Sequence, residues 1–540
     1  MWAGLQAHAD QIKTTHLKNL LANDTQRFED FSFSKPGFLL DLSKQRISNE
    51  TVERLVGLAR EQGLEDWIEK LFNGEQVNDS EQRAALHTAL RQPADAGLAV
   101  EGQDVTGDVH QSLTKMQELV DQIQRAQWRG YDGSPIRSIV NIGVGGSNLG
   151  PLMACDALER NSIEENKQLD VHFVSSMDGS ELEKLLPHLD PAATLFIVAS
   201  KTFTTIDTLA NANTAREWLL AASKATVEVI NQHHFIGVTA SPAIALKWGV
   251  PEKNQLLLWD WTGGRYSLWS VIGMPIALKI GMDNFRAMLK GAHEMDIHFR
   301  EAPFEKNMPV LLGLIGIWNI NFLNIHAHAI LPYDGRLAQL PAYLEQLEME
   351  SNGKSVSRDG FRIDYRTCPV LWGQVGSNAQ HAFYQLLHQG TESVMCDFIT
   401  SAVRYEGEGD ELQEQHQLSL ANCLAQSRLL ALGDSMLEDS ENVPNYKHYD
   451  GNQPSTTILL DELTPETLGG LIALYEHKVF VQSVIWEINP FDQWGVELGK
   501  KVATSLLGNL SEGGGEALDV STNGLIQYIH QQAQGIKSEN

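Results

Sequence analysis

Residues 138–151 read SIVNIGVGGSNLGP, an apolar run that passes directly into a glycine-rich turn. The run at 138–142 predicts a strand, and the pattern at 149–158 predicts a helix. Glycines at such a turn let a ligand approach the backbone, and the N-terminus of the following helix favours anions. The stretch therefore predicts a βα unit whose turn binds a ligand, and the alternative is a tight turn that binds nothing.

Strands and helices are expected to alternate outward from this unit, and the alternation occurs twice. Parallel strands need crossover helices, so this order predicts an α/β fold with two αβα domains and parallel sheets. Strands are expected at 138–142, 171–175, 194–199, 235–239 and 255–259, then at 327–331, 370–372 and 393–399. Helices are expected at 149–158, 179–186 and 208–222, then at 309–325, 336–349, 379–388, 411–432 and 467–486.

The ends of the chain have a different pattern. Residues 1–105 look helical and polar, with apolar positions at helical spacing in 51–71 and 81–90. After three consecutive glycines at 513–515, an amphipathic stretch at 525–534 predicts a helical arm. A chain of 540 residues is too long for one core, which agrees with two domains and two terminal additions.

Composition limits the possible partners. The formal net charge of -28 argues against nucleic acid, whose phosphates would be repelled. The four cysteines lie far apart and form no C-x-x-C pair, so we expect reduced thiols in a cytoplasmic protein. The N-terminus shows no signal-peptide pattern, and the apolar run at 310–325 is too short and too polar to span a membrane.

A second polar loop, SKTFTT at 200–205, follows the expected strand at 194–199 and precedes a helix. Four hydroxyls, one lysine and free N–H groups at a helix start are suited to hold a phosphate. The alternative is a plain helix cap, for which one hydroxyl suffices. Two polar loops at the carboxyl ends of strands in one sheet fit the crevice where α/β sheets bind ligands.

Neither loop fits a nucleotide motif. The third glycine of a G-x-G-x-x-G fingerprint that starts at Gly143 would be residue 148, which is Asn148. The loop at 200–205 is not a Walker A motif, because G-x-x-x-x-G-K-[ST] is absent. The two loops therefore predict a small phosphorylated ligand and imply no nucleoside triphosphate.

Glu350 is a candidate general base. Gln346 lies four residues earlier, on the same face of the expected helix. Residues 351–353, Ser-Asn-Gly, predict the end of that helix, and the negative pole there makes a carboxylate a better base near neutrality. The alternative is an ordinary surface glutamate.

Further candidates are a lysine and several histidines. Gln493 and Lys500 lie two turns apart on one expected helical face, although Lys500 could be merely solvated. His381 is expected to open a helix of the second domain, either as a catalytic acid or as a buried structural residue. His326 and His328 form an H-x-H pair without a third ligand nearby, so core histidines are favoured over a metal site.

Six segments in order resemble the glucose-6-phosphate isomerase family over nearly the whole chain. Two of them look like the family's signatures: DWTGGRYSLWS at 260–270 and NPFDQWGVELGK at 489–500. The other four are the glycine turn at 143, SKTFTT at 200–205, MESNGK at 349–354 and QHAFYQ at 380–385. Residues 78–91 also resemble the family's N-terminal helical segment.

The resemblance implies a fold of two sugar-isomerase (SIS) type αβα sandwich domains with parallel sheets. The first domain is expected at 106–285 and the second at 286–508. An N-terminal helical segment at 1–105 is expected to pack on the second domain, and a C-terminal helical arm at 509–540 completes the chain. The implied partners are a small sugar phosphate and a second copy of the chain, in a homodimer with shared active sites and no membrane association.

The resemblance also implies an activity: interconversion of glucose 6-phosphate and fructose 6-phosphate through ring opening and a cis-enediolate. No cofactor and no metal are expected, because the reaction is neither a net redox step nor a hydrolysis. Glu350 is expected as the base, Arg265 as the group that stabilises the enediolate, and His381 and Lys500 as the groups that open the ring. The expected substrate-binding residues are Gly146, Ser147, Ser200, Lys201, Thr202, Thr205, Gln346 and Gln493.

Two positions depart from the family's pattern, Asp207 and Ala379, which replaces a frequent Gly, and two other functions stay open. Asp207 stands where the family usually carries Glu, which leaves the role of this carboxylate open. A sugar-phosphate sensor would need the phosphate loop, but it has no use for Glu350, Arg265, His381 and Lys500 together. A nucleotide-dependent oxidoreductase is the other alternative, which Asn148 argues against.

Overall fold

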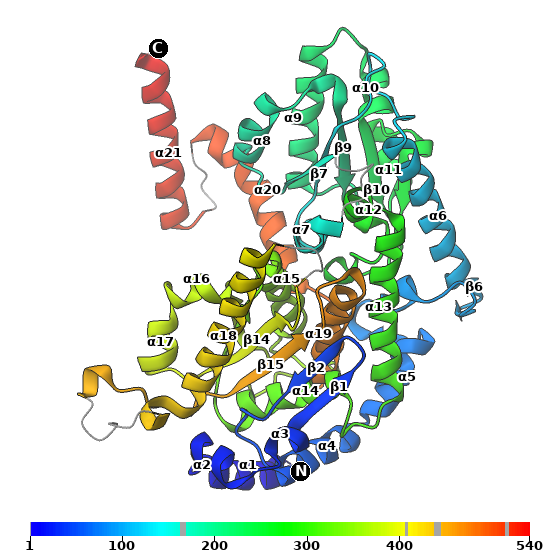
Figure 1. The fold of residues 1–540 in the computed structure, drawn as a ribbon. Coiled ribbons are helices and arrows are strands. Elements are labelled where there is room, and N and C mark those ends of the chain that lie inside the picture. The colour runs from blue at the N-terminus through cyan, green and yellow to red at the C-terminus, as the bar shows by residue number, and fades with distance from the viewer. Residues whose placement is uncertain (1, 162–168, 405–408, 437–443, 514–517, 540) are drawn as a thin grey trace. The chain divides into compact units, whose positions relative to one another are not determined.

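The computed structural model describes residues 2–161, 169–404, 409–436, 444–513 and 518–539. Contacts divide the chain into two compact units, residues 1–491 and 492–540, and each is described by itself. The larger unit contains two main sheets, and the smaller unit consists mainly of two helices (Figure 1).

The first sheet of the larger unit has five strands, and all of its pairings are parallel, in the order β11-β10-β9-β7-β8. Helices α8 and α9 lie on one side of these strands and α6 on the other (Figure 1). The strands are β7 (Ser138–Ile142), β8 (Asp170–Val174), β9 (Thr194–Ala199), β10 (Phe235–Thr239) and β11 (Gln255–Leu257). The helices are α6 (Val105–Gln124), α7 (Leu149–Ala157), α8 (Ser180–Leu185), α9 (Ile206–Ala222), α10 (Val227–His234), α11 (Pro242–Trp248) and α12 (Met274–Ile280).

The second sheet has six strands in the order β1-β2-β15-β14-β12-β13. Its last four strands in this order are parallel, and the hairpin β1–β2 continues the sheet antiparallel at the edge of β15. The strands are β1 (Ser32–Lys35), β2 (Phe38–Asp41), β12 (Ala327–Pro332), β13 (Val370–Gly373), β14 (Val394–Ser401) and β15 (Ser455–Leu460). The expected α/β fold is confirmed: the first sheet is parallel throughout, and the second is parallel in β15, β14, β12 and β13.

The helices that follow the first sheet include long buried segments. They are α13 (Met282–Glu301), α14 (Met308–Ile317), α15 (Leu340–Glu345), α16 (Gly376–Gln380), α17 (Tyr384–Gln389), α18 (Asp410–Leu432) and α19 (Pro465–Ile485). Two of the expected helices end in π-helical turns, at Trp318–Phe322 after α14 and at Gln346–Glu350 after α15. No helix in the described part of the chain has the length and apolar character to cross a bilayer.

The N-terminal region is only partly helical, which corrects the expectation for residues 1–105. Its helices are α1 (Trp2–Ile12), α2 (Leu17–Asn23), α3 (Arg27–Phe31), α4 (Asn49–Glu61) and α5 (Leu64–Asn73). Besides β1 and β2 it holds two small hairpins, β3 (Gln76–Asn78) with β4 (Arg83–Ala84) and β5 (Ala99–Val100) with β6 (Gln103–Asp104). The helix expected at 81–90 is wrong: Gln82 has φ +52°, which an α-helix does not allow, and the apolar residues that suggested it are buried by tertiary packing.

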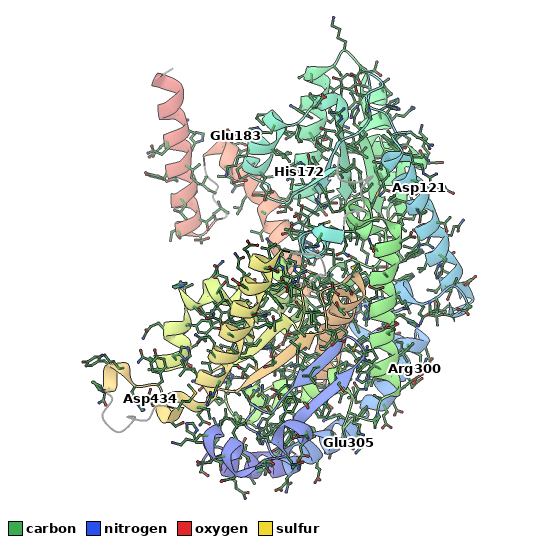
Figure 2. The ribbon with its side chains drawn as sticks, viewed as in Figure 1. Asp121, His172, Glu183, Arg300, Glu305 and Asp434 are labelled. Atoms are coloured by element: carbon green, nitrogen blue, oxygen red, sulfur yellow. The ribbon has the colours of Figure 1, made fainter. Side chains whose placement is uncertain are left out.

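Contacts from this N-terminal region go to the second half of the larger unit. Strand β2 pairs with β15 along residues 38–41. Arg300, at the end of α13, pairs with Glu69, and Glu305, just beyond it, pairs with Arg60 (Figure 2). The main-chain pairing of β2 with β15 fixes where this region packs. The two ion pairs are exposed, and exposed pairs of this kind contribute little stability.

Helices α13 and α19 cross at very short range, because glycines stand at the crossing. A Cβ on Gly291 would lie 1.9 Å from the Glu466 carbonyl oxygen, and one on Gly469 would lie 2.0 Å from that of Met288. The close approach brings charged side chains of both helices into a dry interface. Arg91 donates there to Asp296 of α13 and Glu476 of α19, and all three side chains are buried.

Replacement of Arg91 by Leu is expected to destabilise the protein by about 3–5 kcal/mol, because two buried carboxylates lose the guanidinium that pairs with both of them. Arg60→Leu is the matched control, since its ion pair with Glu305 is about half exposed and should contribute roughly 1 kcal/mol or less. Denaturant unfolding of both variants measures the difference. Equal destabilisation by the two substitutions would contradict a structural role for the buried cluster.

Candidate active site

Two polar loops lie side by side at the carboxyl edge of the five-stranded sheet. Strand β7 leads into the turn at 143–148, and its neighbour β9 leads into the loop at 200–205. The turn is fixed internally, because Asn141 Nδ2 donates to the Ser147 carbonyl oxygen at 3.0 Å. The topology thus brings together the two loops that the sequence marked for a ligand.

The loop at 200–205 has the features of an anion site. The hydroxyls of Ser200 and Thr205 lie 3.0 Å apart. Thr205 stands at the start of α9 without a side-chain capping bond, so the plain helix cap is not formed. Phe203 has φ +51° and a fully buried ring, which holds the loop in a strained conformation typical of functional sites.

Lys201 connects this loop to the segment before Arg265. Its Nζ donates to the carbonyl oxygens of Asp260 at 2.7 Å and Thr262 at 3.1 Å. Burial lowers the pKa of Lys201 to about 8. The ammonium therefore holds the segment at 260–262 in place. It also gives the loop at 200–205 a positive charge that is lost as pH rises through about 8.

The glycine turn packs directly against the same segment. A Cβ on Gly146 would lie 1.9 Å from the Gly264 carbonyl oxygen, so only glycine fits there. Gly145 has φ +55°, and a Cβ on it would lie 2.9 Å from Nε2 of Gln346. The turn therefore lies between the chain that carries Arg265 and the helix turn that carries Gln346.

Arg265, Gln346 and Glu350 form a polar cluster at this place. Gln346 Nε2 donates to Glu350 Oε2 at 3.0 Å, across the π-helical turn 346–350. Arg265 Nη1 lies 3.3 Å from the same oxygen. The arginine side chain is 1% exposed and the glutamate side chain 22%, so Glu350 is not an ordinary surface glutamate.

Other residues hold this cluster, and the sequence analysis did not single them out. The Nε of Arg265 donates to Ser351 Oγ at 2.6 Å, and its Nη2 donates to the Pro490 carbonyl oxygen at 2.6 Å. Lys354 Nζ donates to the carbonyl oxygens of Glu350 and Ser351, which closes the C-terminal end of the π-turn. The only available signal was that these residues adjoin Glu350 or lie within the segments at 349–354 and 489–500.

His381 and Asp207, which both belong to the larger unit, lie outside this cluster. His381 is exposed at the end of α16 and does not open a helix, because residues 381–383 separate α16 from α17. Asp207 lies in the first turn of α9, directly after the loop at 200–205. Asp207 follows β9 of the first sheet, and His381 follows β13 of the second sheet.

Gln493 and Lys500 belong to the smaller unit, residues 492–540. This unit consists of a 3₁₀ turn at Trp494–Val496, α20 (Glu497–Glu512) and α21 (Val520–Glu539). Gln493 precedes the turn, so the single helical face expected for the two residues is wrong. Lys500 Nζ lies 3.0 Å from Glu497 Oε1 on the exposed surface of α20.

His328, the second residue of the histidine pair at 326 and 328, faces a buried carboxylate. His328 Nε2 lies 3.0 Å from Asp397 Oδ2, and Tyr475 donates to the same oxygen. Within the ranges that the structure describes, no group of three or more His, Cys, Asp and Glu side chains could hold a metal ion. His328 is therefore a core histidine paired with a buried carboxylate.

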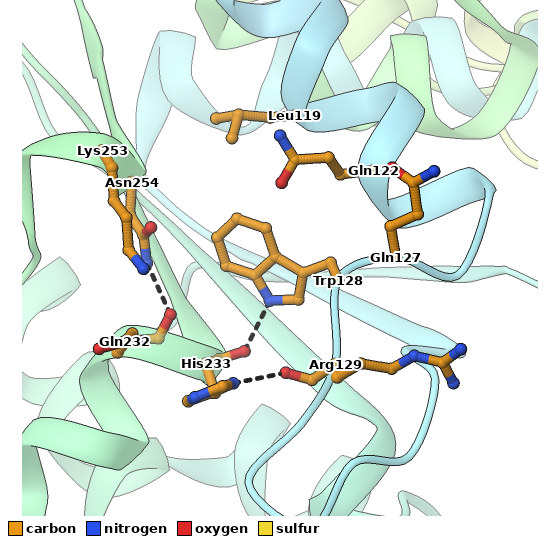
Figure 3. A pocket seen from close by; sticks show the side chains of 9 residues that line it. All are labelled: Leu119, Gln122, Gln127, Trp128, Arg129, Gln232, His233, Lys253 and Asn254. Atoms are coloured by element: carbon orange, nitrogen blue, oxygen red, sulfur yellow. Dashed lines mark hydrogen bonds between the residues drawn. The ribbon is translucent and has the colours of Figure 1, made fainter.

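A separate cavity of about 350 Å³ lies near the amino ends of β10 and β11 (Figure 3). Several of its polar groups are engaged with one another. Trp128 Nε1 donates to the His233 carbonyl oxygen, and Asn254 Nδ2 donates to that of Gln232. Because parallel sheets bind ligands at their carboxyl ends, this cavity is not the expected site.

Comparison with known proteins adds independent findings. A family model described as phosphoglucose isomerase matches residues 41–526. Glucose-6-phosphate isomerase 2 of Chromohalobacter salexigens is 56% identical over 542 residues, covering 98% of this chain and 97% of that protein. The glucose-6-phosphate isomerase of Psychrobacter arcticus is 53% identical, covering 98% and 96%. The crystal structure of a glucose-6-phosphate isomerase from Chlamydia trachomatis matches with a TM-score of 0.86 and 32% identity, covering 98% of each chain.

The affinity for inorganic phosphate is expected to fall as pH rises through about 8, because Lys201 then loses its proton. Loss of one charged hydrogen-bond donor corresponds to roughly tenfold weaker binding. Calorimetric titration between pH 7.5 and 9.5 measures the change, in a range where the dianion fraction of phosphate rises and so cannot itself cause weaker binding. Lys201→Arg should flatten the profile because arginine stays charged, whereas Lys247→Arg on exposed α11 should not. A profile that is unchanged in Lys201→Arg would contradict the assignment.

Proposed function

This chain belongs to the phosphoglucose isomerase family, and on this premise we propose how its residues interconvert D-glucose 6-phosphate and D-fructose 6-phosphate. The enzyme is an aldose–ketose isomerase of glycolysis and gluconeogenesis. The observation that carries the proposed mechanism is the cluster in which the buried Arg265 faces the carboxylate of Glu350. A sugar-phosphate sensor has no use for a base beside a fixed cation.

The phosphate binds at the two loops of the first sheet. Ser200, Thr202 and Thr205 supply hydroxyls, the start of α9 supplies N–H groups, and Gly146 and Ser147 complete the site from the neighbouring turn. Lys201 adds positive charge to the loop while it braces the segment at 260–262. The phosphate is remote from the reacting carbons, so its binding energy serves to orient the sugar.

Glu350 acts as the base that carries the proton. It removes the proton from C2 of the open-chain aldose, and the electron pair of that bond moves through C1 to the carbonyl oxygen. The same carboxylic acid returns the proton to C1, while the hydroxyl proton passes from O2 to O1. Gln346, which donates to this carboxylate, positions the base and the substrate.

Arg265 stabilises the negative charge of the cis-enediolate. A cation held in place before the reaction needs no reorganisation when charge develops, which is why fixed positive groups lower such barriers. Its guanidinium is held by Ser351 and by the Pro490 carbonyl. Its charge is therefore available at a defined position beside the base.

His381 and Lys500 open the sugar ring, and Gln493 positions the substrate. Ring opening requires a proton for the ring oxygen and removal of the anomeric hydroxyl proton, and one histidine and one lysine can divide this work. We assign His381 to the neighbouring subunit of a homodimer, so that each active site combines residues of both chains. Neither step requires a cofactor or a metal.

We place the enzyme in the cytoplasm. All four cysteines are free thiols, and burial raises the pKa of Cys155, Cys368, Cys396 and Cys423. Buried, protonated thiols without disulfides are typical of a reducing compartment.

The purified protein is expected to convert fructose 6-phosphate in a coupled assay without added cofactor and equally well with EDTA. Glu350→Gln should lower kcat by several orders of magnitude, because loss of a base removes the proton-transfer step. It should leave KM nearly unchanged, because the phosphate loops remain intact.

Glu345→Gln is the matched control, since Glu345 lies at the end of α15, outside the Arg265 cluster. It should retain wild-type turnover. Absence of turnover in the folded wild-type protein would contradict the isomerase function. Near-normal turnover in Glu350→Gln would instead contradict only the assignment of the base.

Subunit exchange between two inactive variants, His381→Ala and Glu350→Gln, is expected to restore activity. If each site takes its base from one chain and its histidine from the other, a mixed dimer has one doubly altered site and one intact site. Random exchange makes about half of the dimers mixed, so roughly a quarter of wild-type site activity should return.

The control is exchange of each variant with itself, which should restore nothing. Tagged subunits confirm that mixed dimers have formed. If confirmed mixed dimers stay inactive, the active site is not shared in this way, although the isomerase function still stands.

A further inference from the structure

Ser351 holds the two catalytic segments together through its hydroxyl. It is fully buried and follows Glu350 directly in the chain. Its Oγ accepts from Arg265 Nε at 2.6 Å and lies 2.9 Å from the hydroxyl of Tyr266. These contacts span 86 and 85 residues of sequence, so they connect the segment of Arg265 to the segment of Glu350.

The bonding of this hydroxyl differs from that of the buried serines inside α18 and α19. Ser427 in α18 and Ser483 in α19 donate to backbone carbonyls three residues earlier, which is the usual local bond of a helical serine. Both hydrogen bonds recorded for the Ser351 hydroxyl go to side chains instead. A serine needed only to satisfy the end of its own helix turn would not have this pattern.

Tyr266 is held independently of Ser351. Its ring lies 4.7 Å from that of His87 and 5.6 Å from that of Phe491, and the side chain is buried. The phenol is therefore a fixed partner for the Ser351 hydroxyl. Burial also raises the pKa of Tyr266 to about 12, so the phenol stays protonated and able to donate at neutral pH.

We propose that Ser351, fixed by Tyr266, is a positioning residue that sets the plane of the Arg265 guanidinium toward the enediolate. The inference rests on the proposed function, in which Arg265 stabilises that intermediate. With Nε bound to Ser351 and Nη2 bound to Pro490, two of the three nitrogens of the planar group are fixed. Nη1 is then the group that faces the base and the reacting carbons.

Removal of this hydroxyl should affect the transition state more than substrate binding. In Ser351→Ala, Nε loses its acceptor while Arg265 keeps its charge. Because small displacements of a catalytic group reduce rates strongly, kcat should fall by about 10–100-fold. KM should change little, because the hydrogen bonds of the Ser351 hydroxyl go to Arg265 and Tyr266 and not to the proposed phosphate loops at 143–148 and 200–205.

A binding measurement separates positioning from a general structural defect. A phosphorylated sugar hydroxamate, whose planar oxygens imitate the enediolate, should bind Ser351→Ala about 10–100-fold more weakly than wild type. Inorganic phosphate should bind both proteins equally. Tyr266→Phe, which keeps the packed ring, should change kcat and hydroxamate affinity in the same direction and by a smaller factor.

The decisive comparison is made in an Arg265→Lys background. Lysine has no planar fork for Ser351 to orient. Ser351→Ala should therefore lower kcat in the wild-type background and have no further effect in Arg265→Lys, as expected for residues that act together. An equal decrease in both backgrounds would overturn the proposal.

Ser427→Ala is the matched control for loss of a buried serine hydroxyl, and it should retain wild-type kcat. Thermal unfolding of every variant shows whether the fold is intact. If Ser351→Ala does not fold, Tyr266→Phe replaces it in the comparison of kcat between the wild-type and Arg265→Lys backgrounds. Absence of wild-type turnover would contradict the proposed function itself. Normal wild-type turnover with normal kcat in both Ser351→Ala and Tyr266→Phe would contradict only the positioning role.

Discussion

The buried charge of Arg265 is the constraint on which the architecture of the site depends. A guanidinium withdrawn from water is unstable unless acceptors surround it. Here the acceptors come from distant parts of the chain: the Ser351 hydroxyl, the Glu350 carboxylate and the Pro490 carbonyl. Segments near 265, 350 and 490 must therefore meet at one point. The helices, strands and turns between them must pack so that these segments come into contact.

The neighbouring elements fit this requirement. The glycine turn after β7 can lie against the Arg265 segment because Gly146 carries no side chain. The π-helical turn after α15 places Gln346 and Glu350 within hydrogen-bond distance, and Lys354 satisfies the carbonyls at its end. π-turns are rare and occur often at functional sites, because they aim side chains that a regular helix would not.

The sequence predicted the features that depend on local pattern. Buried parallel strands such as 138–142 and 194–199 were predicted with correct bounds, and the residues of the SKTFTT loop follow β9 as expected. The hairpin β1–β2 was missed because it is stable only beside β15, which lies more than 400 residues later and was missed as well. Two acceptors of Arg265, Ser351 and Pro490, were missed for the same reason, since nothing local in either residue indicates a partner in the segment at 265.

Glu350 and Arg265 differ in burial, and the difference agrees with the roles proposed for them. Glu350 has 22% of its side chain exposed and Arg265 only 1%. A base that takes a proton from C2 and returns it to C1 must move between two carbon atoms. A cation that stabilises an enediolate must stay fixed while charge develops, because any reorganisation would add to the barrier. In the proposed mechanism the mobile role falls to the more exposed residue, and acceptors from two segments, 350–351 and 490, surround the stationary one.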